Sequence, residues 1–471
     1  MKIAKRAPFY GKPVIHTPQI FGASAGKNFI YRIPATGTRP INIKLSNIPD
    51  GISIENGIIF GNLSDCKEYQ IEIIAENCEG ITKKTLKIII EEDGPLKTPL
   101  LGFTTWNAFG SRVTQKDVIS SATALVESGI ADYGYGYVNI DSGWQKEYGG
   151  KYDAIMPNEK FPDMKELCDQ VHSLGLRCGI YSTPMLTAWG CPEELESIPG
   201  CTRGEPDPCF YGIANGGVGL DRRESANVKQ WTEWGFDYLK YDWHPADAAN
   251  ADAMKNVLMA SEREFAYCIT VSAPIQNGQY LKENVNSYRL NPDSLPTWQN
   301  LRHRLNTVRG WDSYVCLGHF YDLDMLAAGG YDRGNFVGAL TDDEEIFAYT
   351  LVSFFMSPIQ ISTPIDKLSD FLLDVFCNDE IIEINQDIKA EFPTLVRKNS
   401  NVKIYKRNLY NGDIAYAIFN LADEKRTEVF EVGKTKSIRD VWRKENIKNT
   451  DVISCELEPH GAMVYRITPK I

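Results

Sequence analysis

One short segment combines residue types and a spacing that suit acid–base chemistry. Residues 236–243 read Phe-Asp-Tyr-Leu-Lys-Tyr-Asp-Trp, the pattern of a short buried strand that ends in an acid. Because side chains alternate along a strand, Tyr238, Lys240 and Asp242 lie on one face. An ammonium group and a carboxylate at the end of a strand indicate either a catalytic pair or a structural ion pair that caps the strand.

Four further acids follow other predicted strands. With Asp242 they make five, and two basic residues would lie close to them. The additional acids are Asp141, Asp293, Asp322 and Asp324, and the basic residues are Lys240 and Arg289. Barrel enzymes gather catalytic groups at the carboxyl ends of their strands. Hydrolysis of a glycosidic bond needs two carboxylates, one that attacks the anomeric carbon and one that protonates the leaving oxygen. A carboxylate cluster could instead bind Ca²⁺ or Mg²⁺, which is the alternative interpretation.

The two acids of such a pair need different environments. The nucleophile must stay ionised, and we expect Lys240, two residues before Asp242, to favour its ionised form. The general acid needs a raised pKa, which neighbouring carboxylates could supply. The chain has no glycine-rich phosphate loop, no close pair of histidines and no serine nucleophile elbow, so we expect neither a metal nor an organic cofactor.

Strand and helix patterns alternate through the middle of the chain and would bring these acids together. Strands are expected near 100–103, 136–141, 177–182, 236–242, 267–272, 285–290, 313–317 and 357–361. Helical patterns lie at 115–128, 163–174, 223–234, 250–262, 296–308, 342–355 and 367–376. Eight strands that alternate with helices predict a (β/α)8 barrel over residues 97–390. The long segment 184–222, which carries Trp189, is expected to wall a pocket.

Short alternating runs flank the barrel on both sides. Residues 1–92 contain such runs punctuated by Gly, Asn and Pro, which predicts a small immunoglobulin-like β-sandwich. Residues 391–471 alternate in the same way, which predicts a C-terminal antiparallel β-sandwich. We therefore expect a multidomain chain with a central barrel and a sandwich at each end.

Composition and charge exclude some classes of partner. A formal net charge of −12 argues against nucleic-acid binding, which needs a basic patch. No apolar run approaches the length of a membrane span. The basic first residues lack the apolar core of a signal peptide. Because polymeric glycans and accessory sandwiches occur outside the cell, we expect a periplasmic or extracellular protein whose leader is absent from this chain, with the cytoplasm as the alternative.

The cysteines show no metal-binding pattern. The chain has 11 cysteines, an odd number, and their spacing matches no zinc site. We expect free thiols, although Cys191, Cys201 and Cys209 share one loop and could form a disulfide in an exported protein.

Several segments of the chain carry motifs of one enzyme family. Residues 101–109 read Leu-Gly-Phe-Thr-Thr-Trp-Asn-Ala-Phe, and further motifs lie at 137–145, 161–165, 175–182, 234–242, 383–387 and 458–461. Together they resemble glycoside hydrolase family 27, the retaining α-galactosidases and α-N-acetylgalactosaminidases of the melibiase clan, whose opening motif is Gly-Trp-Asn-Ser-Trp-Asn. The resemblance covers about residues 97–470. Residues 34–52 in turn resemble immunoglobulin-like modules that precede some bacterial glycosidases.

The resemblance implies a role for each matching residue. Asp242 corresponds to the nucleophile and Asp293 to the general acid/base. The implied substrate-binding residues are Trp106, Asp141, Tyr181, Lys240, Ser272, Arg289 and Asp322. Lys240 and Arg289 would contact sugar hydroxyls, and Trp106 and Asp141 would hold the outer edge of the sugar. Asp324 would be a structural companion of Asp322.

Other positions depart from the galactosidase pattern. Ser142 follows Asp141 where the family commonly has a second acid that recognises the axial hydroxyl of galactose. Ser272 and Ala273 stand where galactosidases often have Glu-Trp, and His244 replaces part of a cysteine-containing turn. The catalytic residues therefore match the family, whereas the residues that would recognise the sugar differ.

Taken together, these features predict an exo-acting retaining α-glycosidase that needs no cofactor. The expected substrate is an oligosaccharide or glycoconjugate with a terminal α-linked galactose. Alternatives are an α-N-acetylgalactosaminidase, a β-L-arabinopyranosidase, an enzyme active on α-glucans, and a non-catalytic carbohydrate-binding protein on a degenerate barrel. The sequence indicates no oligomeric state.

Overall fold

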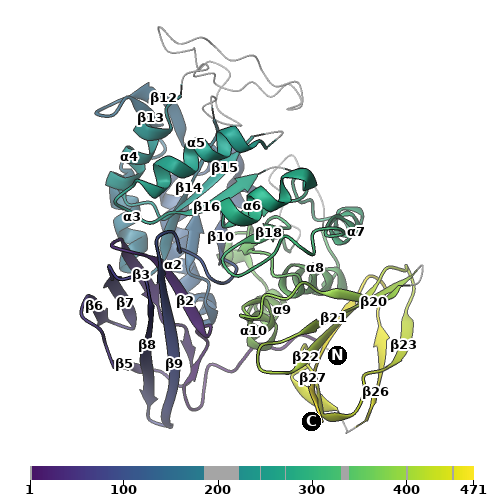
Figure 1. The fold of residues 1–471 in the computed structure, drawn as a ribbon. Helices are drawn as coiled ribbons and strands as arrows, with labels where there is room; N and C mark the ends of the chain where they lie inside the picture. The colour runs from purple at the N-terminus through teal and green to yellow at the C-terminus, as the bar shows by residue number, and fades with distance from the viewer. Residues whose placement is uncertain are drawn as a thin grey trace.

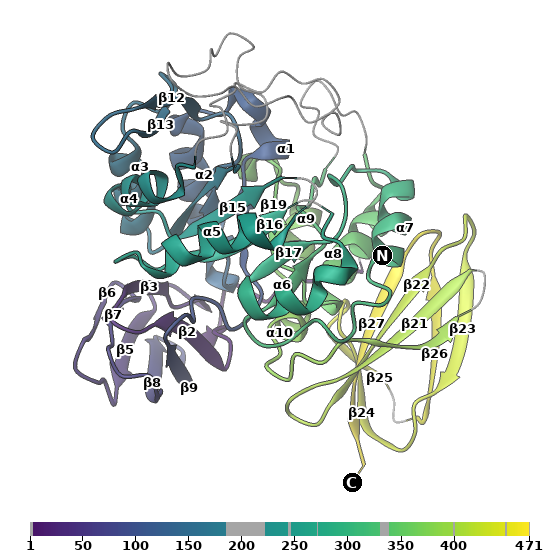
Figure 2. The same cartoon turned by 45° about the horizontal axis from the view of Figure 1, so that its top comes forward.

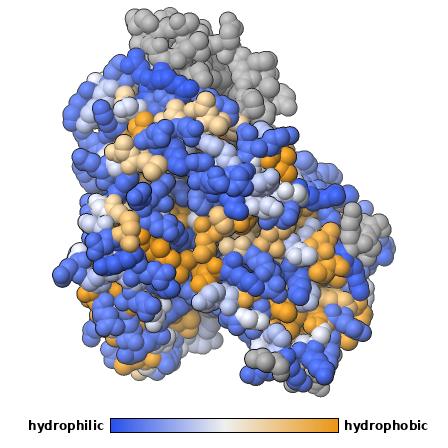
Figure 3. Space-filling view, viewed as in Figure 1, coloured by the Kyte–Doolittle hydropathy of each residue, from blue (hydrophilic) through white to orange (hydrophobic). Residues whose placement is uncertain are grey.

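The computed structural model describes residues 3–184, 222–243, 246–270, 272–329, 339–398, 401–447 and 450–470. Figure 1 shows the barrel above two β-rich lobes, with the N-terminal strands in purple and the C-terminal strands in yellow. The space-filling view in Figure 3 shows the molecule hollowed between these two lobes. No helix in these described ranges is long and apolar enough to cross a membrane.

The central sheet has eight parallel strands that follow one another in chain order. They are β10 (Leu101–Thr104), β11 (Tyr137–Asn139), β14 (Arg177–Ser182), β15 (Tyr238–Asp242), β16 (Ala266–Thr270), β17 (Ser287–Arg289), β18 (Phe320–Asp322) and β19 (Ile359–Ile361). β19 pairs with β10, and a parallel bridge between Leu326 and Ile361 links the segment after β18 to β19. The sheet therefore closes into the (β/α)8 barrel that the alternating pattern predicts.

Helices surround the barrel strands, as Figure 2 shows. They are α1 (Trp106–Phe109), α2 (Gln115–Glu127), α3 (Met164–Ser173), α4 (Glu224–Trp234), α5 (Ala248–Met259), α6 (Gly278–Asn284), α7 (Trp298–Thr307), α8 (Asp342–Phe354), α9 (Asp370–Phe376) and α10 (Asp379–Asn385). Side-chain caps fix several helix starts. Thr114 and Thr341 each form a capping box with the acid three residues later, at the starts of α2 and α8.

The expected seventh strand, near 313–317, is wrong. The apolar run from Val315 to Leu317 reads as a strand, but Gly318 has a φ of 84° and turns the chain there. Cys316 and His319 pair with each other across this turn, and strand β18 begins only at Phe320. The sequence analysis also missed α6, α10 and a hairpin of β12 (Gln145–Gly149) and β13 (Ala154–Pro157).

The N-terminal strands form two facing sheets around their own core, called the N-terminal sandwich below. The strands are β1 (Val14–Ile15), β2 (Ile20–Ser24), β3 (Asn28–Arg32), β4 (Ala35–Thr36), β5 (Asn42–Ser46), β6 (Ile52–Glu55), β7 (Ile58–Asn62), β8 (Glu68–Asn77) and β9 (Gly80–Glu91). The two sheets run β2-β9-β8-β5 and β3-β7-β6, and β1 and β4 form a separate two-stranded sheet. Alternate apolar side chains such as Ile71, Ile73 and Ile88 fill the space between them. An immunoglobulin-like relationship stays a prediction.

The C-terminal strands form the second sandwich, called the C-terminal sandwich below. They are β20 (Thr394–Lys398), β21 (Val402–Asn408), β22 (Ile414–Asn420), β23 (Arg426–Glu431), β24 (Thr435–Asp440), β25 (Glu445–Ile447), β26 (Val452–Leu457) and β27 (Ala462–Pro469). One face of the larger sheet packs against α8, where Phe347 meets Phe419 and the indole of Trp442 donates to Thr350 Oγ1 at 3.0 Å. The domain limits at 92, 97 and 390 stay predictions.

Candidate active site

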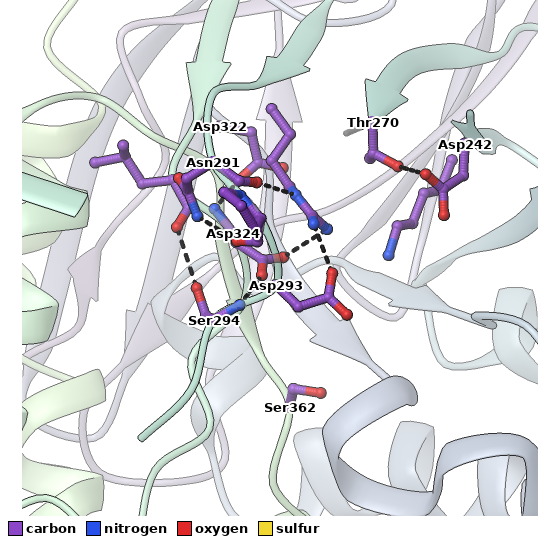
Figure 4. A network of polar contacts seen from close by, with 12 residues as sticks. Asp242, Thr270, Asn291, Asp293, Ser294, Asp322, Asp324 and Ser362 are labelled. Atoms are coloured by element: carbon purple, nitrogen blue, oxygen red, sulfur yellow. Dashed lines mark hydrogen bonds and ion pairs between the residues drawn. The ribbon is translucent and has the colours of Figure 1, made fainter. Parts of the chain in front are cut away.

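Asp242 is the last residue of β15, and neighbouring strands hold both of its carboxylate oxygens. Thr270, its partner in register on β16, donates from its hydroxyl to Asp242 Oδ1 at 2.5 Å (Figure 4). Tyr181 on β14 donates to Asp242 Oδ2 at 2.8 Å. The two hydroxyl donors fix the orientation of the carboxylate at the mouth of the barrel.

Lys240 forms its ion pair with Asp141 rather than with Asp242. Its Nζ lies 2.7 Å from Asp141 Oδ2, and both side chains are almost fully buried. The other oxygen of Asp141 accepts the backbone N–H of Ser142 at 2.8 Å. The expectation that Lys240 acts on Asp242 therefore holds only at longer range, through the charge and not through a contact.

Burial dominates the electrostatics of this half of the site. Burial raises the pKa of the Asp242 carboxyl above its ordinary value, although Lys240 and Arg289 act in the opposite direction. Burial alone would lower the pKa of Lys240, but the adjacent Asp141 carboxylate outweighs it and the pKa is raised. Burial also raises the pKa of Tyr181, which keeps its phenol protonated as a hydrogen-bond donor.

Asp293 lies on the loop after β17 and is held by the arginine that ends that strand. Arg289 Nη2 is 2.5 Å from Asp293 Oδ1, and its Nε donates to the carbonyl of Asn291 at 2.9 Å. Arg289 Nη1 reaches Asp324 Oδ1 at 3.3 Å. The Asp293 side chain is 50% exposed, whereas that of Arg289 is 2% exposed. The guanidinium of Arg289 thus contacts the Asp293 carboxylate directly.

Asp322 and Asp324 hold the loop that carries Asp293 in place by accepting backbone N–H groups. Asp324 Oδ2 accepts the backbone N–H of Ser294 at 2.6 Å, and Asp322 Oδ1 accepts the backbone N–H of Asp324 at 2.6 Å. Asp324 has a φ of 74°, a left-handed conformation that few side chains adopt. Burial and the neighbouring Asp324 raise the pKa of Asp322 to about 6. Figure 4 shows these acids on one side of the network and Asp242 with Thr270 on the other.

The remaining predicted residues also follow barrel strands. Trp106 begins α1 directly after β10, so it lies at the same end of the barrel as Asp242. Ser272 follows β16 with a φ of 51°, and the next residue, Ala273, donates its backbone N–H to the carbonyl of Arg289 at 2.7 Å. Ser142 is buried beside Asp141. Trp189, His244 and the cysteines Cys191, Cys201 and Cys209 lie outside the described residues.

Sequence reasoning missed three residues that shape the site, namely Thr270, Asn291 and Ser294. Thr270 could have been found, because the predicted strand 267–272 runs beside the predicted strand of Asp242. Asn291 and Ser294 contribute backbone groups to the site, and no pattern of side chains in the sequence indicates such contacts. In the part of the chain that the structure describes, no group of three or more His, Cys, Asp and Glu side chains is arranged to hold a metal ion.

Comparison with known families gives two matches, one over the first part of the barrel region and one over the C-terminal sandwich. A model described as alpha galactosidase A matches residues 98–200. A second, the alpha galactosidase C-terminal beta sandwich domain, matches residues 399–467. Alpha-galactosidase A of Cellvibrio japonicus is 26% identical over 409 residues, which is 79% of this chain and 93% of that protein. An α-galactosidase of Oryza sativa is also 26% identical, over 80% of this chain and 86% of that protein.

Solved structures with the same fold fall into two groups. A candidate α-galactosidase from Bacteroides fragilis has a TM-score of 0.85 at 25% identity and covers 98% of this chain and 99% of its own. A β-L-arabinopyranosidase from Geobacillus stearothermophilus has a TM-score of 0.70 at 22% identity and covers 80% of this chain and 97% of its own. The first group thus extends over nearly the whole chain. From the two family matches and the α-galactosidase relatives, we conclude that the chain is a glycoside hydrolase that is similar to the α-galactosidases of the melibiase family.

Proposed function

We propose that the protein is an exo-acting retaining α-galactosidase, with Asp242 as the nucleophile and Asp293 as the general acid/base. The observation that carries this proposal is the contrast in how the two carboxylates are held. Asp242 is buried, and Thr270 and Tyr181 fix both of its oxygens. Asp293 is half exposed on a loop, where it can meet a leaving group and water. The relatives named α-galactosidase support the choice of galactose.

The reaction proceeds by double displacement. An oxygen of Asp242 attacks the anomeric carbon while Asp293 gives a proton to the departing glycosidic oxygen, which leaves a β-linked glycosyl-enzyme. Asp293, now a carboxylate, then takes a proton from a water molecule, and this water attacks the anomeric carbon. The bond to Asp242 breaks, and the sugar leaves with its α configuration retained.

The residues around the two acids have separate tasks in this proposal. The Lys240–Asp141 ion pair presents an ammonium and a carboxylate to sugar hydroxyls, and Trp106 covers an apolar face of the ring. Tyr181 lines the floor beneath Asp242. Arg289 orients Asp293, and Ser272 and Asp322 serve as further contacts to the sugar.

An active-site substitution tests the assignment directly. The Asp242→Ala variant should lose turnover of an activated aryl α-galactoside while its circular dichroism and melting profile stay native. The exposed Asp312→Ala variant serves as a matched control and should hydrolyse like the wild type. Hydrolysis of the aryl galactoside by Asp242→Ala at the wild-type rate would remove Asp242 from the mechanism. Proton NMR of the first product should show the α anomer, and a first β anomer would exclude retention.

The small side chains after β16 favour one second candidate, an α-N-acetylgalactosaminidase. Ser272 and Ala273 leave more room than the Glu-Trp pair expected of galactosidases, and a 2-acetamido group needs such room. A panel of nitrophenyl glycosides separates the candidates by kcat/KM. A higher kcat/KM for α-N-acetylgalactosaminide than for α-galactoside would replace the proposed substrate, and a higher value for β-L-arabinopyranoside would do the same.

A further inference from the structure

A polar cleft lies where the barrel meets both sandwiches, at the end of the barrel opposite the catalytic acids. Its volume is about 310 Å³, and its lining includes residues 14–19, Tyr133, Asp379, Glu383, Gln386 and Arg466. Gln386, on this lining, donates to the carbonyl of Pro99, just before β10 begins, which places the cleft at the amino ends of the strands. The cleft lies at the hollow between the two lobes in Figure 3, and Figure 1 shows α10 between them.

Most charged groups of the cleft have partners of opposite charge, and Lys84, which forms no ion pair among the described residues, lies close enough to Glu383 for that carboxylate to favour its charged form. Arg466 Nη1 pairs with Glu383 Oε2 at 2.8 Å, and Asp379 pairs with Lys444. Burial lowers the pKa of His16 to about 4, so its imidazole is neutral at neutral pH. A free anion or cation would therefore meet no uncompensated opposite charge from these groups.

Three groups in the cleft nevertheless keep unused hydrogen-bonding capacity. The hydroxyl of Thr17 is buried and has no partner among the described residues, and the whole residue is 1% exposed. Lys84 Nζ donates to the carbonyls of Ile15 and Thr17, which leaves one of its three N–H groups. Glu383 uses only Oε2 for its ion pair. The cleft thus offers a donor, an acceptor and a hydroxyl that can be either.

Apolar side chains complete the lining. Ile15, Ile382, Ile388 and Leu409 face the same space as the polar groups. A volume near 300 Å³ is at the lower end of the range for small-molecule sites, which combine an apolar wall with a few polar groups. Sugars match this combination, because a pyranose ring presents hydroxyls at its edge and C–H groups on its faces.

We propose that this cleft binds a neutral, hydroxyl-rich molecule of the size of a monosaccharide unit, as an accessory site remote from the catalytic mouth. Thr17, Lys84 and Glu383 hydrogen-bond its hydroxyls, and the isoleucines contact its C–H face. The unit comes either from a free sugar or from the end of a larger glycan.

Methyl NMR of the full-length protein resolves this site from the catalytic mouth. With ¹³C-labelled isoleucine methyls, galactose should shift Ile15, Ile382 and Ile388 in a saturable way, in the wild type and equally in Asp242→Ala. The methyl of Ile140, next to Asp141, reports separately on the mouth. Raffinose, added to Asp242→Ala so that it persists, distinguishes the sources: shifts with raffinose alone identify the end of a glycan. No shift of the three cleft methyls with either sugar would overturn the proposal.

Two variants tie the binding to the cleft. Thr17→Val keeps the shape of the side chain but removes the unpartnered hydroxyl, and it should weaken binding at the cleft about fivefold. Asn411→Trp fills the cleft from its rim and should abolish the shifts. Both variants should keep wild-type kcat on an aryl galactoside, as should the control Thr123→Val on α2. Wild-type affinity at the cleft methyls in both Thr17→Val and Asn411→Trp would refute the site.

Discussion

The two proposed catalytic carboxylates are built in different ways, one on a strand and one on a loop. Asp242 ends β15, and two hydroxyls from the adjacent strands β14 and β16 hold its oxygens. Asp293 lies four residues beyond β17, and the guanidinium of Arg289 contacts its carboxylate. The strands thus fix the orientation of the Asp242 carboxylate, whereas the loop leaves the Asp293 side chain half exposed to solvent.

This difference fits the two tasks. A nucleophile forms one bond in one direction, so a fixed carboxylate is an advantage. A general acid/base exchanges protons first with a leaving group and then with water, and both must reach it. The Arg289 side chain acts on both carboxylates. It contacts Asp293, and its charge partly offsets the burial that raises the pKa of Asp242.

The largest effect should come from removing the nucleophile. Asp242→Ala should lower kcat by about 10⁴-fold or more, because the covalent step has no substitute on β15. Added azide should enter from the vacated side and give the β-glycosyl azide, which NMR identifies. An α-glycosyl azide from Asp242→Ala would mean that another residue forms the covalent intermediate.

Removing the loop carboxylate should cost less and should depend on the substrate. Asp293→Ala should lower kcat by about 10²–10⁴-fold for a natural disaccharide, which needs a proton on its leaving oxygen. The loss should be much smaller for a 2,4-dinitrophenyl galactoside, whose leaving group departs without a proton. Here azide should give the α-glycosyl azide, since Asp242 still forms the intermediate. An equal loss for both substrates would contradict the role of Asp293 as the general acid.

The same difference explains what the sequence could predict. Asp242, Lys240 and Asp141 were predictable because alternation along a strand fixes the face on which each side chain lies. The ion-pair partner of Lys240 was not predictable, because the pairing depends on how β11 and β15 are arranged in the barrel. On the loop side, the position of Asp293 follows from the chain order, but its contact with Arg289 depends on a backbone path that Asp324 supports with a left-handed φ.

The seventh strand illustrates the same limit. Val315-Cys-Leu and the pair Phe320-Tyr321 are both short apolar runs, and composition alone cannot separate them. Only the turn at Gly318 and the pairing of Phe320 with Ser287 select the second run. Short strands in a barrel are thus chosen by their neighbours in the closed sheet.

A smaller effect should follow from removing one of the two hydrogen bonds that hold the Asp242 carboxylate. Thr270→Val removes the hydroxyl donor to Asp242 and keeps the size of the side chain, so kcat should fall about 10–100-fold with little change in KM. That hydrogen bond favours the ionised carboxylate and lowers its pKa. Without it the pKa of Asp242 rises further, so the acid limb of the kcat/KM profile should move to higher pH.

The pH profile separates positioning from a purely structural role. Thr232→Val on α4, which loses a hydroxyl bonded to Ser261 Oγ, is the matched control and should keep the wild-type profile. If Thr270→Val lowers kcat but leaves the acid limb in place, the hydroxyl does not act on the ionisation of Asp242.

The smallest effect concerns stability on the loop side, where Asp322 lies buried under Asp324. Its pKa of about 6 exceeds the ordinary value of 3.8, so the folded state binds more protons than the unfolded state between these values. Stability contributed by this residue therefore falls as pH rises from about 4 to 6. Asp322→Asn cannot ionise, and its amide oxygen can still accept the backbone N–H of Asp324.

The variant should accordingly gain in melting temperature relative to the wild type as pH rises. Between pH 4 and pH 7 we expect the difference, measured by calorimetry, to shift by about 2–4 °C in favour of Asp322→Asn. The exposed Asp312→Asn should show no such trend. Parallel profiles for Asp322→Asn and the wild type would mean that Asp322 titrates normally in the fold. The surroundings of Asp293 would then contain no buried protonated acid. They would differ from the surroundings of Asp242 only through the contact with Arg289.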